Sequence, residues 1–197
     1  MSKEELIEEV ATEVMACRKC PLWKKRKRPV PGEGDINADV MFIGEAPGYW
    51  EDIKGKPFVG SAGEIFDEML SKIGLSRNEV YIANILKCRP PENRDPSASE
   101  IEACVPYLDQ QIRIIKPKII VTLGRHSTSY IFSKGGLEVA GITKLHGRKY
   151  EVELLGFKIL LLPMYHPAAV LYNPKYRSAL ERDFQLLSRE LERLRCI

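Results

Sequence analysis

Three polar side chains, far apart in the sequence, come at or just after the ends of apolar runs. Glu45 follows the run 40–43, in a turn that holds two glycines and a proline. Asn84 lies near the end of a second run, 80–85, and His166 follows a third. A carboxylate, an amide and an imidazole can bind a polar substrate and handle its protons. We therefore expect one shared pocket, provided that the three runs are strands ending at one edge of a sheet.

Each of these residues also has an ordinary structural role that must be weighed. A glutamate in a tight turn can simply face water, and an asparagine near a strand end can cap the strand. A histidine before a proline, as at His166-Pro167, can belong to a turn. On its turn alone, Glu45 fits the ordinary role better, and only the joint placement of the three groups favours chemistry.

Four of the five cysteines form a second candidate site. Cys17 and Cys20 are a C-x-x-C pair, while Cys88 and Cys104 each lie in a turn or near a helix start. Four thiolates can hold a tetrahedral zinc ion or an iron–sulfur cluster. Structural zinc sites usually show two close pairs, and the fifteen residues between Cys88 and Cys104 favour a 4Fe–4S cluster, with zinc as the alternative. Cys196 has no neighbouring thiol and fits a small apolar role.

The apolar runs predict an α/β fold with a parallel sheet, as one domain over residues 1–197. Strands are expected at 39–44, 80–85 and 118–124, with the glycine of the last unit at its end, and two more at 148–155 and 157–164, around Gly156. Helices are expected at 2–16, 62–73, 97–115 and 125–132 and from about 174. Residues 49–57 show no clear periodicity. Pro106 should kink or restart the helix that contains it.

Composition places the chain among globular proteins, with 44% hydrophobic and 29% charged residues and a net charge of +3. No apolar run approaches the ~20 residues that span a bilayer, and the first five residues lack a signal segment, so we expect a cytoplasmic protein. The cationic run Lys24–Arg28 is bracketed by prolines. It predicts a pinned loop that can lie along phosphates, although such runs are often plain solvated loops.

Taken together, these segments resemble the iron–sulfur (family 4) uracil-DNA glycosylases. The likeness extends from Cys17 to about Pro174, and its motifs are Gly44–Gly48, Gly55–Gly60, Asn84, Lys87–Pro91, His166–Ala168 and the four cysteines. The resemblance implies a three-layer α/β/α fold around a central four-stranded parallel sheet. It also implies a 4Fe–4S cluster bound by a subregion formed by 17–20 and 88–104.

The resemblance further implies an enzyme that excises uracil from DNA and leaves an abasic site in base excision repair, without cutting the strand. Glu45 and His166 are then the expected catalytic residues, with His166 donating to uracil O2. Four residues are the expected substrate-binding residues. The backbone of Gly44 helps at uracil O2, Phe58 stacks on the flipped base, and Asn84 reads its N3–H and O4. Leu171 enters the gap that the flipped base leaves in the DNA.

The expected partner is uracil-containing DNA, single- or double-stranded, with no membrane contact and a monomeric protein; a replication-clamp contact stays open. The main rival is a non-catalytic iron–sulfur or zinc nucleic-acid-binding module, which needs the cysteines but not Glu45, Asn84 and His166 together. A second rival is a related glycosylase of different base specificity. A C-x-x-C oxidoreductase is the third, and the long basic loop between the pair and the first strand argues against it.

Overall fold

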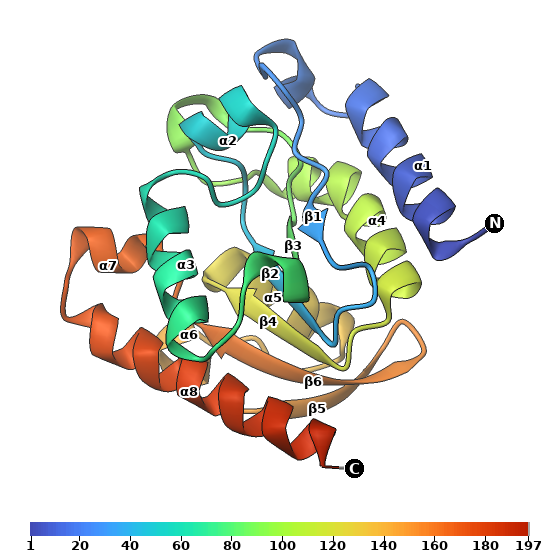
Figure 1. Ribbon diagram of the computed structural model, residues 1–197. Coiled ribbons are helices and arrows are strands. Elements are labelled where there is room, and N and C mark those ends of the chain that lie inside the picture. The colour runs from blue at the N-terminus through green and yellow to red at the C-terminus, as the bar shows by residue number, and fades with distance from the viewer. Residues whose placement is uncertain (197) are drawn as a thin grey trace.

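The computed structural model, described here for residues 1–196, is built around one six-stranded sheet in the order β1-β3-β2-β4-β6-β5 (Figure 1). The four central strands, β3, β2, β4 and β6, run parallel, and β1 and β5 pair antiparallel at the edges. The predicted central four-stranded parallel sheet is therefore confirmed. The strands are β1 Glu33–Gly34, β2 Val40–Gly44, β3 Tyr81–Asn84, β4 Ile119–Leu123, β5 Tyr150–Leu154 and β6 Phe157–Met164.

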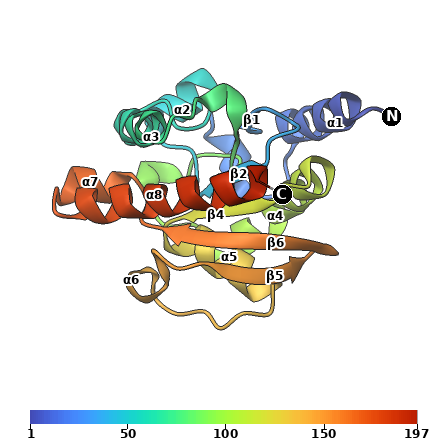
Figure 2. The same ribbon diagram turned by 60° about the horizontal axis from the view of Figure 1, so that its bottom comes forward.

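Helices cover both faces of this sheet and complete the three predicted layers (Figure 2). One face carries α3, α7 and α8, and the other carries α4 and α5, with α1 packed on α4. None of the helices within residues 1–196 has the length and apolarity that crossing a membrane requires. The helices are α1 Lys3–Ala16, α2 Tyr49–Lys54, α3 Ser61–Lys72, α4 Ala98–Ile115, α5 Arg125–Lys134, α6 Ile142–Leu145, α7 Ala168–Tyr172 and α8 Tyr176–Arg195.

The central strand β2 is buried on both faces, as its unbroken apolar run predicts. Alternate side chains point to opposite faces of a strand, so Phe42 packs between α3 and α8 while Met41 and Ile43 face α4 and α5. The ring of Phe42 lies 4.9 Å from that of Phe66 and 5.8 Å from that of Phe184. This packing gives the turn after β2 a rigid base.

Two local predictions need correction. Residues 49–54, expected to be irregular, form helix α2, because the Glu51 carboxylate accepts from the backbone N–H of Gly48 at 3.1 Å and of Val59 and Gly60 at 2.9 Å each. Of the two outcomes predicted at Pro106, a kink or a restart, the restart is wrong: helix α4 continues through Pro106, since its apolar face is buried on the sheet on both sides of that residue. Tertiary contacts outweigh local preference at both places.

Candidate active site

Glu45, Asn84 and His166 line one cleft of about 580 Å³ at the carboxyl ends of the parallel strands. Glu45 follows β2 directly, Asn84 is the last residue of β3, and His166 comes two residues after β6. The register of β2 and β3 pairs Gly44 with Asn84. Parallel strands end at the same edge of a sheet, and the structure therefore brings together three groups that are distant in the sequence.

The Asn84 side chain is fixed in the floor of this cleft. Only 3% of the residue is exposed, and its Oδ1 atom is buried without a hydrogen-bond partner. The Lys87 ammonium donates to the backbone carbonyl of Asn84 at 3.0 Å and holds the strand end in place. At Gly44, a Cβ atom would lie 2.4 Å from Asn84 Oδ1. Glycine is therefore required there, because any side chain would displace the amide.

Phe58 forms one wall of the cleft in a strained backbone conformation. Its φ is 51°, in the left-handed region, and its ring stacks on that of His166 with centroids 5.5 Å apart and planes 23° apart. Arg77 donates to the backbone carbonyls of Phe58 and Pro57. Helix α3 approaches so closely that a Cβ at Gly63 would lie 1.9 Å from the Phe58 carbonyl oxygen. These contacts hold the ring in one orientation despite the strain.

His166 is held as a neutral imidazole with a defined tautomer. Its Nδ1 accepts from the backbone N–H of Ala168 at 3.1 Å, so Nε2 carries the proton. Burial lowers the pKa of His166 to about 4, and the ring is therefore uncharged near neutral pH. Gly124 has a φ of 88°, and a Cβ there would lie 3.2 Å from the His166 Cβ, which makes glycine the fitting residue.

Glu45 is partly buried, with 29% of its side chain exposed, and it has charged neighbours that were not predicted. Burial raises the pKa of Glu45; His126 and Arg125 lower it, whereas Asp95 raises it further. His126 Nε2 lies 3.9 Å from Glu45 Oε2. The sequence identifies Glu45 as a polar residue shortly after a strand. The same pattern could have identified His126, because only Gly124 and Arg125 separate it from the end of β4.

Exposed apolar side chains surround the mouth of the cleft. Leu171 is 50% exposed and Tyr172 90% exposed on α7, whereas their neighbour Val170 is buried. Tyr49 and Trp50 on α2 also line the cleft. Each is 52% exposed, and their rings pack edge to face. Leu171 therefore does not belong to the core, and its side chain is free to contact a ligand.

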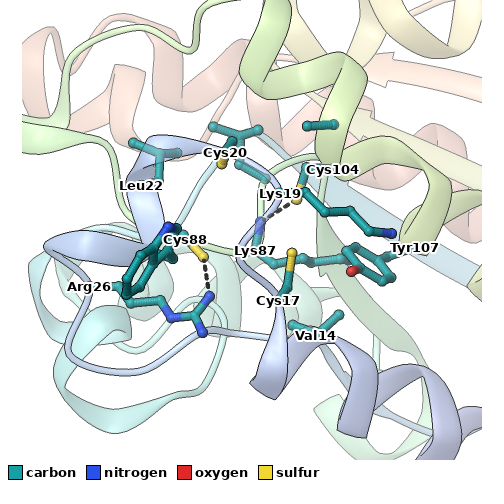
Figure 3. Close-up of a pocket in the computed structure, with 13 residues that line it drawn as sticks. Val14, Cys17, Lys19, Cys20, Leu22, Arg26, Lys87, Cys88, Cys104 and Tyr107 are labelled. Carbon is teal, nitrogen blue, oxygen red and sulfur yellow. Dashed lines mark hydrogen bonds between the residues drawn. The ribbon is translucent and has the colours of Figure 1, made fainter.

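Four free cysteines, Cys17, Cys20, Cys88 and Cys104, gather around a second, small pocket (Figure 3). The Arg26 guanidinium donates to Cys88 Sγ at 3.2 Å, and the backbone N–H of Lys87 donates to Cys104 Sγ at 3.2 Å. Burial raises the pKa of Cys104 to about 12, so a bare thiol there stays protonated near neutral pH and needs a cation to become a thiolate. The pocket joins α1, the basic loop and α4 through Cys17, Cys20, Cys88 and Cys104.

The four cysteine sulfurs could serve as ligands of a metal centre. Among the described residues, no three of the cysteine sulfurs lie within 4.8 Å of one another. Tetrahedral zinc, with Zn–S bonds of about 2.3 Å, would need sulfurs about 3.8 Å apart. As they lie, the sulfurs are more widely spaced than a single zinc ion requires, and the four thiols form an all-sulfur donor set for a metal centre.

The basic run Lys24–Arg28 is only partly a solvated loop. Lys24, Lys25, Lys27 and Arg28 are exposed, while Arg26 turns inward to the cysteine pocket and donates to the Met15 carbonyl at 3.0 Å. The backbone N–H of Lys27 donates to the buried Asp52 at 2.9 Å. The loop is therefore anchored at both α1 and α2, with four cations outside.

Comparison with known proteins agrees with this geometry. The family model for the uracil DNA glycosylase superfamily matches residues 31–192. A type-4 uracil-DNA glycosylase of Saccharolobus solfataricus is 55% identical over 92% of this chain and 85% of that protein, and one of Archaeoglobus fulgidus is 49% identical over 92% and 91%. A type-5 uracil-DNA glycosylase of Thermus thermophilus is 30% identical over 73% and 70%. The chain therefore belongs to the uracil-DNA glycosylase superfamily and, within it, to the type-4 family.

Proposed function

We propose that this chain hydrolyses the N-glycosidic bond of uracil in DNA, releasing the base and leaving an abasic site, as the first step of base excision repair. The observation that carries the proposal is the buried, unpartnered Oδ1 of Asn84 in a cleft that also holds Glu45 and His166. An orphaned buried acceptor costs about 1–3 kcal/mol, so such an atom is best explained by a ligand that pairs with it.

Uracil has the complementary edge. A base within a duplex is out of reach, so the nucleotide must first turn out of the helix into the cleft. There, Asn84 Oδ1 accepts from uracil N3–H, and its amide N–H donates to O4. Phe58, fixed by its strained backbone, offers the face on which the base stacks. Cytosine presents the opposite donor and acceptor pattern at both positions and is rejected.

His166 and Glu45 act on the N-glycosidic bond. When the C1′–N1 bond breaks, its electron pair passes to uracil, and negative charge collects at O2 while the sugar becomes a cation. The neutral His166 donates its Nε2–H to O2, in a site prepared before the charge develops. Glu45, as a carboxylate, stabilises the sugar cation and orients the water that adds at C1′. Protonation of the uracil anion completes the hydrolysis.

The surface around the cleft suits DNA. Leu171 is exposed at the mouth, where it can fill the gap that the extruded base leaves. Four exposed cations of the loop Lys24–Arg28 can contact phosphates. We therefore expect activity to fall steeply as the salt concentration rises, a dependence that measurements between 50 and 200 mM salt check.

We further propose that Cys17, Cys20, Cys88 and Cys104 bind a 4Fe–4S cluster. When bound, the cluster supplies a cross-link between loops and no step of the hydrolysis. Lys87 connects the cysteine pocket to the cleft, because its backbone N–H contacts Cys104 while its ammonium holds the Asn84 carbonyl. The cluster thereby supports the strand end that presents Asn84.

A labelled oligonucleotide containing one uracil tests the function. After incubation and alkali, we expect cleavage at uracil and none in thymine or cytosine controls; strand scission without alkali would contradict a monofunctional enzyme. His166→Asn keeps the acceptor for Ala168 N–H but removes the Nε2 donor, and we expect a roughly 10²- to 10³-fold lower kcat. His146→Asn is the matched control, because His146 lies outside the cleft and bonds Asp183 through Nδ1.

A further inference from the structure

His126 is a partly buried histidine beside the candidate catalytic carboxylate, and the hydrolysis as described gives it no role. It is the second residue of α5, which begins directly after β4, and 21% of its side chain is exposed. Its Nε2 atom lies 3.9 Å from Glu45 Oε2 and 3.5 Å from Asp95 Oδ1. Within residues 1–196, this nitrogen has no hydrogen-bond partner although it is buried.

These distances describe a contact that is nearly made. Both exceed the 3.2 Å limit of a good N–H···O hydrogen bond, yet a small side-chain rotation of Glu45 would close the gap. Catalytic hydrogen bonds are often long without substrate and shorten when the substrate is bound. Asp95 is less free to move towards His126, because it also accepts from the Arg125 guanidinium.

We propose that His126 is a positioning residue, whose Nε2–H holds the Glu45 carboxylate in the orientation that faces the sugar of the flipped nucleotide. Asp95 competes for the same N–H, because its carboxylate lies within 4.8 Å of both His126 Nε2 and the Glu45 carboxylate. The inference rests on the proposed function, since it assigns a role within uracil excision. His126 itself does not touch the base, so its effect should fall on kcat rather than on KM.

The pH profile offers a readout that a merely structural role would not change. Glu45 must be ionised to act, so activity falls at acidic pH as this carboxylate is protonated. The position of this fall, the acid limb of the pH–rate profile, follows the pKa of Glu45. His126 lowers that pKa and Asp95 raises it, and removal of each should move the limb in opposite directions. The titratable or charged groups around the Glu45 side of the cleft are Arg125 and His126 on α5, Arg94 and Asp95 before α4, Glu51 on α2 and His166 after β6.

The experiment compares three variants in single-turnover uracil excision from an oligonucleotide. For His126→Leu we expect a roughly ten- to hundredfold lower rate, unchanged DNA binding and an acid limb at higher pH. His126→Gln, which restores an N–H near the position of Nε2, should recover most of the rate. Asp95→Asn should move the acid limb to lower pH. Lys134→Gln is the control, because this α5 residue pairs with Asp109 away from the cleft.

Two results would overturn the proposal. One is an acid limb that stays in place in both His126→Leu and Asp95→Asn, at unchanged melting temperature. The other is activity that EDTA abolishes and added Mg²⁺ or Mn²⁺ restores, because Glu45, Asp95 and His126 would then be metal ligands. If His126→Leu does not fold, Asp95→Asn and His126→Gln decide. Absence of uracil excision by the unaltered protein would refute the proposed function first, so the two failures are distinguishable.

Discussion

Asn84→Asp tests the assignment of base recognition to one buried amide. The change replaces an NH₂ group by an oxygen of nearly the same size, in a residue that is 3% exposed and backed by Gly44. In the unaltered protein, cytosine presents an acceptor at N3 and a donor at N4, where uracil presents a donor and an acceptor, so both hydrogen bonds to Asn84 are lost. At about 1–3 kcal/mol for each mispaired buried group, discrimination against cytosine amounts to about 2–6 kcal/mol, or roughly 30- to 10⁴-fold.

In the variant, burial raises the pKa of the new carboxyl group, which favours its protonated form. With its proton on one oxygen, a neutral carboxyl donates to cytosine N3 and accepts from the cytosine amino group; it pairs with uracil only when the proton is on the other oxygen, so the preference for uracil weakens. We therefore expect a slower rate on uracil and a uracil-to-cytosine rate ratio that falls at least tenfold. The assay is single-turnover excision from paired oligonucleotides that differ in one base.

Asn93→Asp is the matched control, because Asn93 lines the same cleft but accepts from Arg89 and has no place in base recognition. Its rate ratio should equal that of the unaltered protein. If Asn84→Asp lowers both rates equally and leaves the ratio unchanged, at an unchanged melting temperature, then Asn84 supports the fold and does not read the base.

Three further predictions address other parts of the site. Glu45→Gln should lower kcat by roughly 10²- to 10⁴-fold and remove the loss of activity at acidic pH that protonation of Glu45 causes, because burial keeps His166 neutral down to about pH 4; a pH–rate series checks both. Leu171→Ala should slow excision more in double-stranded than in single-stranded DNA, since only the duplex leaves a gap to fill, and equal losses would count against the wedge. Cys104→Ser should give a colourless protein with a lower melting temperature, whereas a fully loaded, brown protein would show that this cysteine is no ligand.

Much of the fold could be predicted because its strands are continuous apolar runs. Burial on both faces leaves β2, β4 and most of β6 without polar interruptions, and the groups that follow such runs meet at one edge. The capping boxes of Ser2 with Glu5 and Ser97 with Glu100 likewise identify two helix starts from local sequence.

The rest depends on contacts between distant segments. Helix α2 has only six residues and is stabilised by the reach of Glu51 across to Val59 and Gly60, which no local pattern shows. The approach of Asp95 to His126 arises from where a loop lies against α5. Periodicity carries no information on either contact, and both shape the site.

The most direct test of the account is a crystal structure of the protein with DNA that carries a non-hydrolysable deoxyuridine analogue. We expect the uracil out of the helix and stacked on Phe58, with N3–H and O4 paired to the Asn84 amide and O2 within hydrogen-bond distance of His166 Nε2. A uracil that stays stacked in the duplex, or one that occupies a cleft without contacting Asn84 and His166, would contradict the account.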